Sequence, residues 1–342
     1  MVTMRDKVAR ARGWTSRSSG DGVQALGEFR DVIKAVIGNV ERAVLGKRPV
    51  IEMALASVLG GGHVLLEDVP GVAKTVLVRA MARTMGCTFS RIQCTPDLLP
   101  TDVSGVSVFN QKTGSFEFRP GPVFSQVVVA DEINRATPRT QSALLEAMGE
   151  GQVSADGVTH RLEKPFIVFA TQNPVEHEGT FPLPEAQLDR FMMRLTLGYP
   201  DIAAEASMLE MLRTGSPVDE LEPVADAAVI LRMQAKVREI HIHKNVRDYL
   251  LRIVSRSRDS VHLTLGASPR AAFSFFRAAQ ACAAVRGRAY VIPDDIKGLA
   301  RAVLEHRLIL NPESRLRRVT VTQVVRDIIE EVATPSARGG WA

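Results

Sequence analysis

The sequence predicts an α/β domain built around a buried parallel sheet, followed by a smaller helical domain. Five short apolar runs alternate with helical patterns in the first part of the chain, at residues 63–67, 88–92, 126–131, 165–171 and 191–197. Runs of this length, bounded by polar or turn residues and separated by helices, are typical of strands buried on both faces. After about residue 200, only the three-to-four spacing of helices is found.

The domain boundaries follow from the same patterns. Five helical stretches are predicted in the second part, at residues 201–212, 224–240, 247–258, 269–285 and 294–307. Residues 214–223 (TGSPVDELEP) are rich in turn formers and predict a loop. We therefore predict a basic flexible tail, an α/β domain and a helical domain, at residues 1–26, 27–199 and 200–335.

The positive charge is concentrated at the amino-terminal end. The 342-residue chain has a net charge of +5, and residues 1–20 supply +4 of it, from five Lys or Arg against one Asp. The remainder is nearly neutral and the chain has only 5% aromatic residues, so we expect no nucleic-acid partner. Three cysteines without C-x-x-C spacing, and the lack of a long apolar run, predict a cytoplasmic protein without a membrane span.

Two hairpins are predicted as insertions in the α/β domain. Residues 106–109 and 116–119 alternate apolar and polar side chains around NQKTGS. The second hairpin surrounds Asp156-Gly157, a pair typical of two-residue turns. Both could be decorative edges, but their place between core elements fits protruding functional loops at least as well.

A phosphate-binding loop is predicted between the first apolar run and the helix after it. LLEDVPGVAKT has the order strand, Gly-containing turn, Lys-Thr and helix, in which backbone N–H groups and Lys74 face phosphates and Thr75 binds Mg²⁺. Asp68 and Ala73 stand where the strict pattern has glycine. We expect the Asp68 carboxylate to point away and bond to loop N–H groups, and Ala73 to be tolerated if its φ is negative. The predicted ATP-binding residues of the loop are Asp68, Val69, Pro70, Gly71, Val72, Ala73, Lys74, Thr75 and Val76.

Polar residues end two further strands. VVVADEIN places Asp131 to hold Mg²⁺ and Glu132 to polarise the attacking water. FATQNP places Asn173 where an amide orients that water. Because the carboxyl ends of parallel strands share one edge of a sheet, these residues are expected beside the phosphate loop.

Arginines complete the predicted site. Arg190, just before the last strand, is a candidate to reach the nucleotide of a neighbouring subunit, with Arg194 and Arg135 as rivals and an ordinary ion pair to Glu185 or Asp189 as the alternative. Arg270 lies in the first turn of a helix, where a cation opposes the helix dipole, so an anionic partner such as phosphate is expected.

Taken together, five motifs resemble the MoxR family of AAA+ ATPases over roughly residues 27–310. They are LLEDVPGVAKT, TPDLLPTDVSG, FRPGPVFSQVVVADEINRATPRTQSALLEAMGEGQV, FATQNPVEHEGTFPLPEAQLDRFMMR and GASPRA. His177 departs from the Gln usual in relatives. The resemblance implies an AAA+ P-loop parallel sheet core with a small all-helical lid, assembled as a hexameric ring with ATP and Mg²⁺ between subunits.

The resemblance also implies roles for residues and partners. Leu45 and Gly46 would cup the adenine, Asn173 would be sensor 1, Arg270 sensor 2 and Arg190 the arginine finger. The hairpins would project into the ring centre. Such ATPases remodel client proteins or insert metals and cofactors into them, often with a partner that carries a von Willebrand factor A domain.

Three other functions compete with this interpretation. A nucleic-acid motor is disfavoured by the neutral folded part, and a scaffold with little turnover is disfavoured by Glu132 and Asn173. His241-x-His243 is the basis for a metal site, but this pair is more typical of a solvated helix end.

Overall fold

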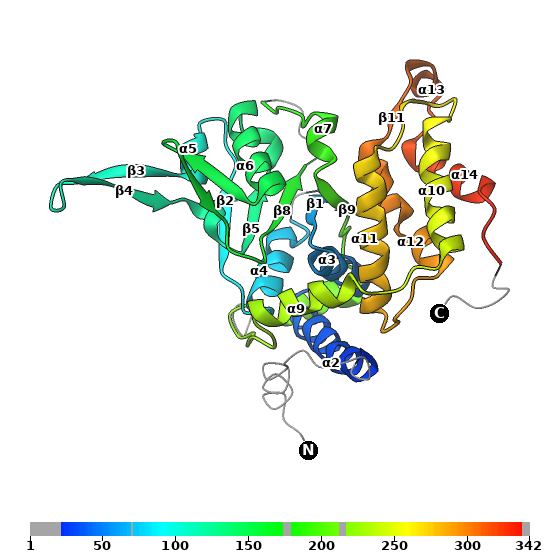
Figure 1. Ribbon diagram of the computed structural model, residues 1–342, viewed down its shortest axis with the longest axis horizontal. Coiled ribbons are helices and arrows are strands. Elements are labelled where there is room, and N and C mark those ends of the chain that lie inside the picture. The colour runs from blue at the N-terminus through cyan, green and yellow to red at the C-terminus, as the bar shows by residue number, and fades with distance from the viewer. Residues whose placement is uncertain (1–21, 70, 174–178, 212–216, 337–342) are drawn as a thin grey trace.

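A parallel sheet of five strands in the order β2-β5-β8-β1-β9 forms the centre of the molecule (Figure 1). The computed structural model describes residues 22–69, 71–173, 179–211 and 217–336. The strands are β1 (His63–Glu67), β2 (Phe89–Gln93), β5 (Val127–Asp131), β8 (Ile167–Gln172) and β9 (Phe191–Leu195). The predicted strands are thus confirmed, with ends that shift by no more than two residues.

Side chains alternate across this sheet and pack against helices on both faces. Val127 and Val129 face a core shared with α3 (Arg48–Gly60) and α4 (Lys74–Thr84), whereas Val128 and Ala130 face a second core that includes α6 (Pro138–Glu150). Because both faces are covered, all five residues of β5 are buried, which explains why the strand reads as a continuous apolar run.

Helix α2 (Gly22–Glu41) precedes the sheet and packs against α3 and α4. Residues 22–26, which we assigned to the flexible tail, belong to this helix. The rest of the predicted tail, residues 1–21, lies outside the described residues.

The second part of the chain is a helical domain that also carries two short strands. Its helices are α10 (Lys244–Arg258), α11 (Pro269–Val285), α12 (Pro293–Leu304), α13 (Pro312–Leu316) and α14 (Val321–Glu331). The strands β10 (Leu263–Leu265) and β11 (Ile309–Leu310) pair antiparallel, so the all-helical prediction was wrong at these residues. Their few backbone hydrogen bonds tie the turn before α11 to the turn after α12, a long-range pairing that helical periodicity does not reveal.

Helix α9 (Ala227–Val237), which follows α8 (Ile202–Met211), packs differently from the later helices. Val229, Ile230 and Met233 of α9 are buried in the core that contains α3, and Gln234 donates a side-chain hydrogen bond to the Val58 carbonyl at 2.7 Å. Although α9 follows residue 200, it therefore packs on the α/β domain.

Ion pairs link the helical domain to strand β9 and to Asp189, two residues before it. The Arg307 guanidinium is 2% exposed and contacts the Asp189 carboxylate at 2.7 Å. Arg194 of β9 pairs with Glu67 at 2.6 Å and with Glu305 at 2.9 Å. Since a buried charge without its partner is costly, these contacts hold both domains in one arrangement.

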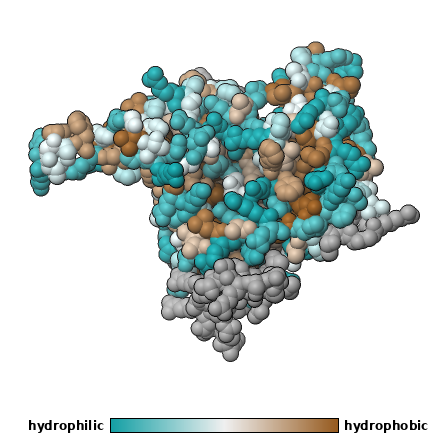
Figure 2. All heavy atoms as spheres, in the orientation of Figure 1, coloured by the Kyte–Doolittle hydropathy of each residue, from teal (hydrophilic) through white to brown (hydrophobic). Residues whose placement is uncertain are grey.

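Both predicted hairpins are confirmed. They are β3–β4 (Gly105–Asn110, Ser115–Pro120) and β6–β7 (Gln152–Ala155, Val158–Arg161), and the first projects far from the sheet (Figure 1). Phe109 and Phe116 near its tip are 51% and 73% exposed, and Figure 2 shows apolar side chains on this arm. Phe118 stacks on His160 of the second hairpin, so the two hairpins contact one another.

The remaining short elements are α5 (Pro100–Ser104), α7 (Glu185–Leu188) and three 3₁₀ turns at Pro122–Phe124, Ile133–Arg135 and Glu305–Arg307. Within the described part of the chain, no helix has the length and apolar character needed to cross a membrane.

Candidate functional site

A cavity of about 330 Å³ opens at the carboxyl edge of the sheet. The loop after β1 leads into α4 at Lys74, so the amino end of this helix forms one wall. The ends of β5 and β8 form the other. The lining residues are Gly71, Ala73, Lys74, Thr75, Val76, Asp131, Glu132, Thr171 and Asn173. All of these except Thr171 are predicted site residues, so eight of the predicted residues meet in one cavity. Pro70 lies outside the described residues.

The Asp68 side chain points away from this cavity, which confirms the expectation for its orientation. Its Oδ1 accepts a hydrogen bond from the Val69 N–H at 2.9 Å, and its Oδ2 accepts one from the Gly198 N–H at 2.6 Å. The Lys74 ammonium donates to the Asp68 carbonyl oxygen at 2.6 Å. The carboxylate thus supports the loop and does not face a bound anion.

The backbone φ angle of Ala73 is positive, not negative as we expected. Its φ is +63°, in the left-handed region, where we had expected alanine to be tolerated only at negative φ. The loop turns into α4 at this residue, and that turn requires the conformation for which glycine is best suited. Val69 and Val72 precede this turn, and Val72 is buried in the core next to α4.

Replacing Ala73 with glycine is expected to raise the free energy of unfolding by about 0.5–1 kcal/mol. Relief of the left-handed strain, about 1–2 kcal/mol, outweighs the larger entropy that glycine gives the unfolded chain. Urea unfolding of the wild type and Ala73→Gly measures the difference. As a control, Ala80→Gly in the helical interior of α4 should lower stability by at least about 1 kcal/mol. If the Ala73→Gly protein were less stable than the wild type, the left-handed backbone at Ala73 would not be strained.

Asp131, at the end of β5, is surrounded by donors. Its Oδ2 accepts a hydrogen bond from the Thr75 hydroxyl at 3.2 Å, and its Oδ1 accepts one from the Thr171 hydroxyl at 2.7 Å. A hydroxyl and a carboxylate oxygen at this separation can contact the same hydrated cation, and such oxygens are the ligands that Mg²⁺ prefers. The residues present therefore fit a magnesium site.

Glu132 occupies a strained position beside Asp131. Its φ is +56°, and its N–H donates to the Thr171 hydroxyl at 2.8 Å. Its carboxylate pairs with Arg135 at 3.1 Å and stays 28% exposed. Asn173 is buried at the end of β8 and lines the same cavity. A strained, partly exposed carboxylate at a polar cavity is a common arrangement for a group that acts on water.

Cys94 is buried near these carboxylates and does not line the cavity. Burial, with added contributions from Asp131 and Glu132, raises its pKa to about 12. The thiol therefore stays protonated at neutral pH and is no candidate nucleophile.

The segment Leu45-Gly46 lies next to the phosphate loop. Gly46, with φ of +69°, approaches Ala204 of α8, and the Lys47 ammonium donates to the Tyr199 carbonyl at 2.7 Å. The adjoining Gly198 is the residue that binds Asp68. These contacts bring residues 45–47, the chain before α8 and the loop together, as required of a nucleotide base site beside a phosphate site.

Known proteins share this arrangement. Residues 63–193 match the model of the ATPase family associated with various cellular activities (AAA), and residues 255–328 match the AAA lid domain. The crystal structure of a putative ATPase from Cytophaga hutchinsonii superposes with a TM-score of 0.86 and 39% identity, covering 92% of this chain and 98% of that one. YeaC of Bacillus subtilis, described as uncharacterized, is 47% identical over 91% of this chain and 97% of its own length. The chaperone MoxR1 of Mycobacterium tuberculosis is 40% identical, over 92% of this chain and 85% of its own. The chain belongs to the MoxR family of AAA+ ATPases.

Two of the arginines expected in a MoxR-type site lie away from the cavity of their own chain. Arg190 directly precedes Phe191, which pairs with His63 at the first residue of β1, whereas the phosphate loop follows the last residue of β1. A strand of this length spans about 15 Å. The Arg190 guanidinium donates to the Leu145 carbonyl near the end of α6, at the amino edge of the sheet.

Arg270 lies at the same edge. Ser268, two residues before it, donates to the Asp189 carboxylate at 2.7 Å. Burial, opposed by a hydrogen bond to Met148, lowers the pKa of His63 to about 4, and the positive charge of Arg270 contributes to the same shift. Arg270 therefore lies far from the phosphate loop of its own subunit, and a nucleotide bound there would not be its anionic partner. The spacing of motifs in the chain could not show on which edge of the sheet Arg270 lies.

The rival arginines have other partners. Arg194 is held between Glu67 and Glu305, and Arg135 contacts Glu132 of its own chain. Asp189, the alternative partner for Arg190, contacts Arg307 instead. Arg190, which is partly exposed, and Arg270, which is exposed, are therefore the candidates at the amino edge for contact with the nucleotide of a neighbouring subunit.

Two polar residues of the site were missed in the sequence. Thr171 is 1% exposed and bridges Asp131 to the Glu132 backbone. Its position in FATQN, two residues before Asn173 on a buried strand, could have identified it. Arg91, on the edge strand β2, contacts Asp131 at 2.7 Å. A lone arginine in a short strand gives no sequence signal of this contact.

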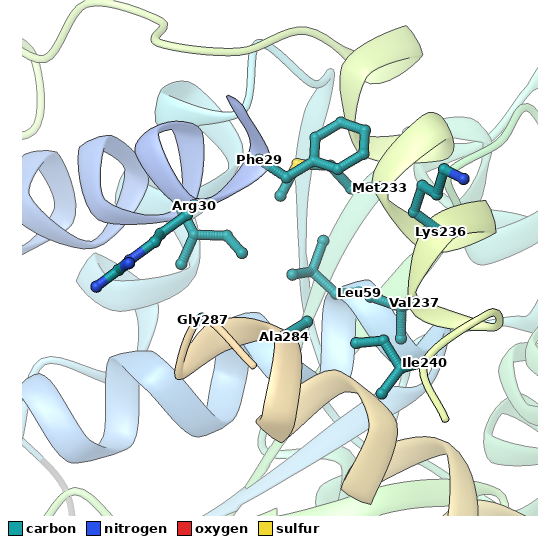
Figure 3. A pocket seen from close by; sticks show the side chains of 10 residues that line it. Phe29, Arg30, Leu59, Met233, Lys236, Val237, Ile240, Ala284 and Gly287 are labelled. Atoms are coloured by element: carbon teal, nitrogen blue, oxygen red, sulfur yellow. The ribbon is translucent and has the colours of Figure 1, made fainter. Parts of the chain in front are cut away.

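A second hollow, between α2, α3, α9 and α11, is shown in Figure 3. It is lined mostly by apolar side chains such as Phe29, Leu59 and Ile240, with Arg30 and Lys236 at its rim. Its volume of about 20 Å³ is close to that of one water molecule, so it is a packing gap without room for a ligand.

The His241-x-His243 pair has a structural role at the start of α10. The His243 ring accepts a hydrogen bond from the Asn245 N–H at 3.2 Å and so caps the helix, while the backbone of His241 bonds with the chain at Ala289 and Val291.

Proposed function

We propose that this MoxR-family protein is a Mg²⁺-dependent ATPase that works in a ring and uses ATP to remodel client proteins. The observation that carries the proposal is the single cavity in which Lys74, Thr75, Asp131, Glu132 and Asn173 meet at the amino end of α4. A cation, two magnesium ligands, a carboxylate and an amide are the groups that phosphoryl transfer to water requires.

The loop and α4 would bind the phosphates. Backbone N–H groups of residues 71–76 and the positive end of the α4 dipole attract negative charge. Lys74 would exchange its contact with the Asp68 carbonyl for the β- and γ-phosphates. Bound at Thr75 and Asp131, Mg²⁺ would neutralise charge on those phosphates.

Glu132 would act on the attacking water. Its carboxylate accepts a proton from water as the water oxygen bonds to the γ-phosphorus and the bond from that phosphorus to the ADP oxygen breaks. Asn173 would orient the water and the γ-phosphate by hydrogen bonding. Thr171 holds the Asp131 carboxylate and the Glu132 backbone in place by two hydrogen bonds.

Arg190 and Arg270 would complete the site of a neighbouring subunit. Both lie at the amino edge of the sheet, about one strand length from their own phosphate loop. In a closed ring each subunit presents one face to the next, so the amino edge of one copy would meet the cavity of another. This arrangement supports a ring with ATP between subunits, and we propose that the ring is a hexamer.

The hairpins would contact the client. Phe109 and Phe116 are exposed on an arm that projects from the body, and MoxR1 is described as a chaperone. We also propose that the clients include proteins that receive a metal or cofactor. A protein with a von Willebrand factor A domain would act as a partner.

Calorimetry with ATP and ADP tests the nucleotide site. We expect binding in the presence of Mg²⁺, and we expect Lys74→Ala to weaken it by at least about tenfold, because a charge-assisted contact to phosphate is lost. Chelation of Mg²⁺ should reduce phosphate release to background. Lys112→Ala, at the exposed hairpin tip, is the matched control and should bind as the wild type does. If neither ATP nor ADP gave a heat of binding at millimolar concentration, the proposal would be refuted.

A further inference from the structure

Arg91 holds the carboxylate that is expected to bind magnesium. Its Nε and Nη2 donate to the same oxygen, Asp131 Oδ2, at 3.0 Å and 2.7 Å. This is also the oxygen that the Thr75 hydroxyl contacts at 3.2 Å. The other oxygen, Oδ1, is taken by Thr171. The protein's own donors therefore occupy both oxygens of Asp131.

The position of Arg91 in the sheet directs it to this carboxylate. Strand β2 lies beside β5 with Arg91 opposite Val129 and Gln93 opposite Asp131. Nη2 of Arg91 also donates to the Gln93 side-chain oxygen, which orients the guanidinium toward the end of β5. The arginine side chain is 52% exposed, whereas that of Asp131 is 12% exposed. Arg91 can therefore leave into solvent, but Asp131 has to stay.

Magnesium and Arg91 compete for the same charge. A divalent cation at Asp131 Oδ2 and Thr75 would lie within a few ångströms of the guanidinium, and two like charges at such a distance repel strongly in a partly buried site. A single carboxylate oxygen also lacks the lone pairs to serve the threonine, two guanidinium N–H groups and a cation.

We propose that Arg91 is a positioning residue that neutralises Asp131 before nucleotide binds and is displaced from Oδ2 when Mg²⁺ enters. Arg91 thereby sets the Mg²⁺ concentration that nucleotide binding requires. This inference rests on the proposed function, because it assumes that Asp131 and Thr75 receive Mg²⁺ with the nucleotide.

The test measures nucleotide binding as Mg²⁺ is varied. A fluorescent ADP analogue is titrated with Mg²⁺ from micromolar to millimolar concentration, and the midpoint is compared between the wild type and Arg91→Gln. Because one competing charge is removed, the midpoint should fall by about tenfold. Arg79→Gln is the matched control, since Arg79 is 48% exposed and pairs with Asp219 at 2.6 Å, away from the cavity. Its midpoint should equal that of the wild type.

A midpoint for Arg91→Gln that equals or exceeds the wild-type value would overturn the inference and leave the ATPase proposal intact. Absence of ADP binding by the wild type at every Mg²⁺ concentration would refute the proposed function itself. Circular dichroism checks that each variant is folded. If Arg91→Gln is not folded, Arg91→Lys replaces it, because lysine keeps the charge but loses the two-nitrogen contact. Its midpoint should lie below the wild-type value, and a value at or above it overturns the inference.

Discussion

Glu132→Gln is expected to reduce phosphate release by at least about 100-fold while ATP binding is retained. The amide has nearly the shape of the carboxylate but cannot accept the proton of the attacking water, and removal of a general base costs about this much. The phosphate-binding side of the cavity, Lys74 and Thr75, is unchanged by the substitution. Steady-state phosphate release and calorimetry with ATP measure the two effects separately.

Glu146→Gln provides the control for this experiment. Glu146 is exposed on α6, and its replacement should leave the rate at the wild-type level. Equal rates for wild type and Glu132→Gln would favour a nucleotide-gated scaffold over an ATPase. Because ATP should stay bound to Glu132→Gln, the same variant is suited to retain a client for identification.

Elements with a strong local pattern were predicted well from the sequence. Strands β1 and β5 read as continuous apolar runs because helices cover both faces of the sheet, and α11 has the predicted bounds because Ser268 and Pro269 start it. The orientation of Asp68 followed only in part from a local argument, since its Oδ1 binds the Val69 N–H of the loop, whereas its Oδ2 binds the N–H of Gly198, which is far away in the chain.

Features that depend on tertiary structure could not be obtained in this way. The left-handed conformation of Ala73 results from how the loop enters α4, and alanine itself does not favour it. The location of Arg270 depends on docking of the helical domain through Arg307 and Asp189, residues far apart in the chain. Arg91 reaches Asp131 only because β2 and β5 are neighbours in the sheet, although they are not consecutive strands.

Arg190→Ala is expected to lower phosphate release by at least about 100-fold without loss of nucleotide binding. An arginine that neutralises transition-state charge from a neighbouring subunit contributes about this much or more. Its own cavity is unaffected, since Arg190 lies at the opposite edge of the sheet and contacts Leu145. The decisive measurement mixes two inactive proteins, Arg190→Ala and Glu132→Gln, at equal concentration. An Arg190→Ala subunit keeps an intact Glu132, and a Glu132→Gln neighbour supplies an intact arginine, so about one interface in four contains both. The mixture should recover about a quarter of the wild-type rate.

The control replaces the second protein by one that carries both Glu132→Gln and Arg190→Ala. This double variant has no arginine to supply, so its mixture with Arg190→Ala should stay inactive. Light scattering with ATP present establishes that mixed assemblies form. If they form and the first mixture stays inactive, Arg190 does not act between subunits. Recovery in the first mixture alone would mean that the amino edge of one sheet completes the cavity at the carboxyl edge of the next, because Arg190 and Glu132 lie at opposite ends of the strands within each chain.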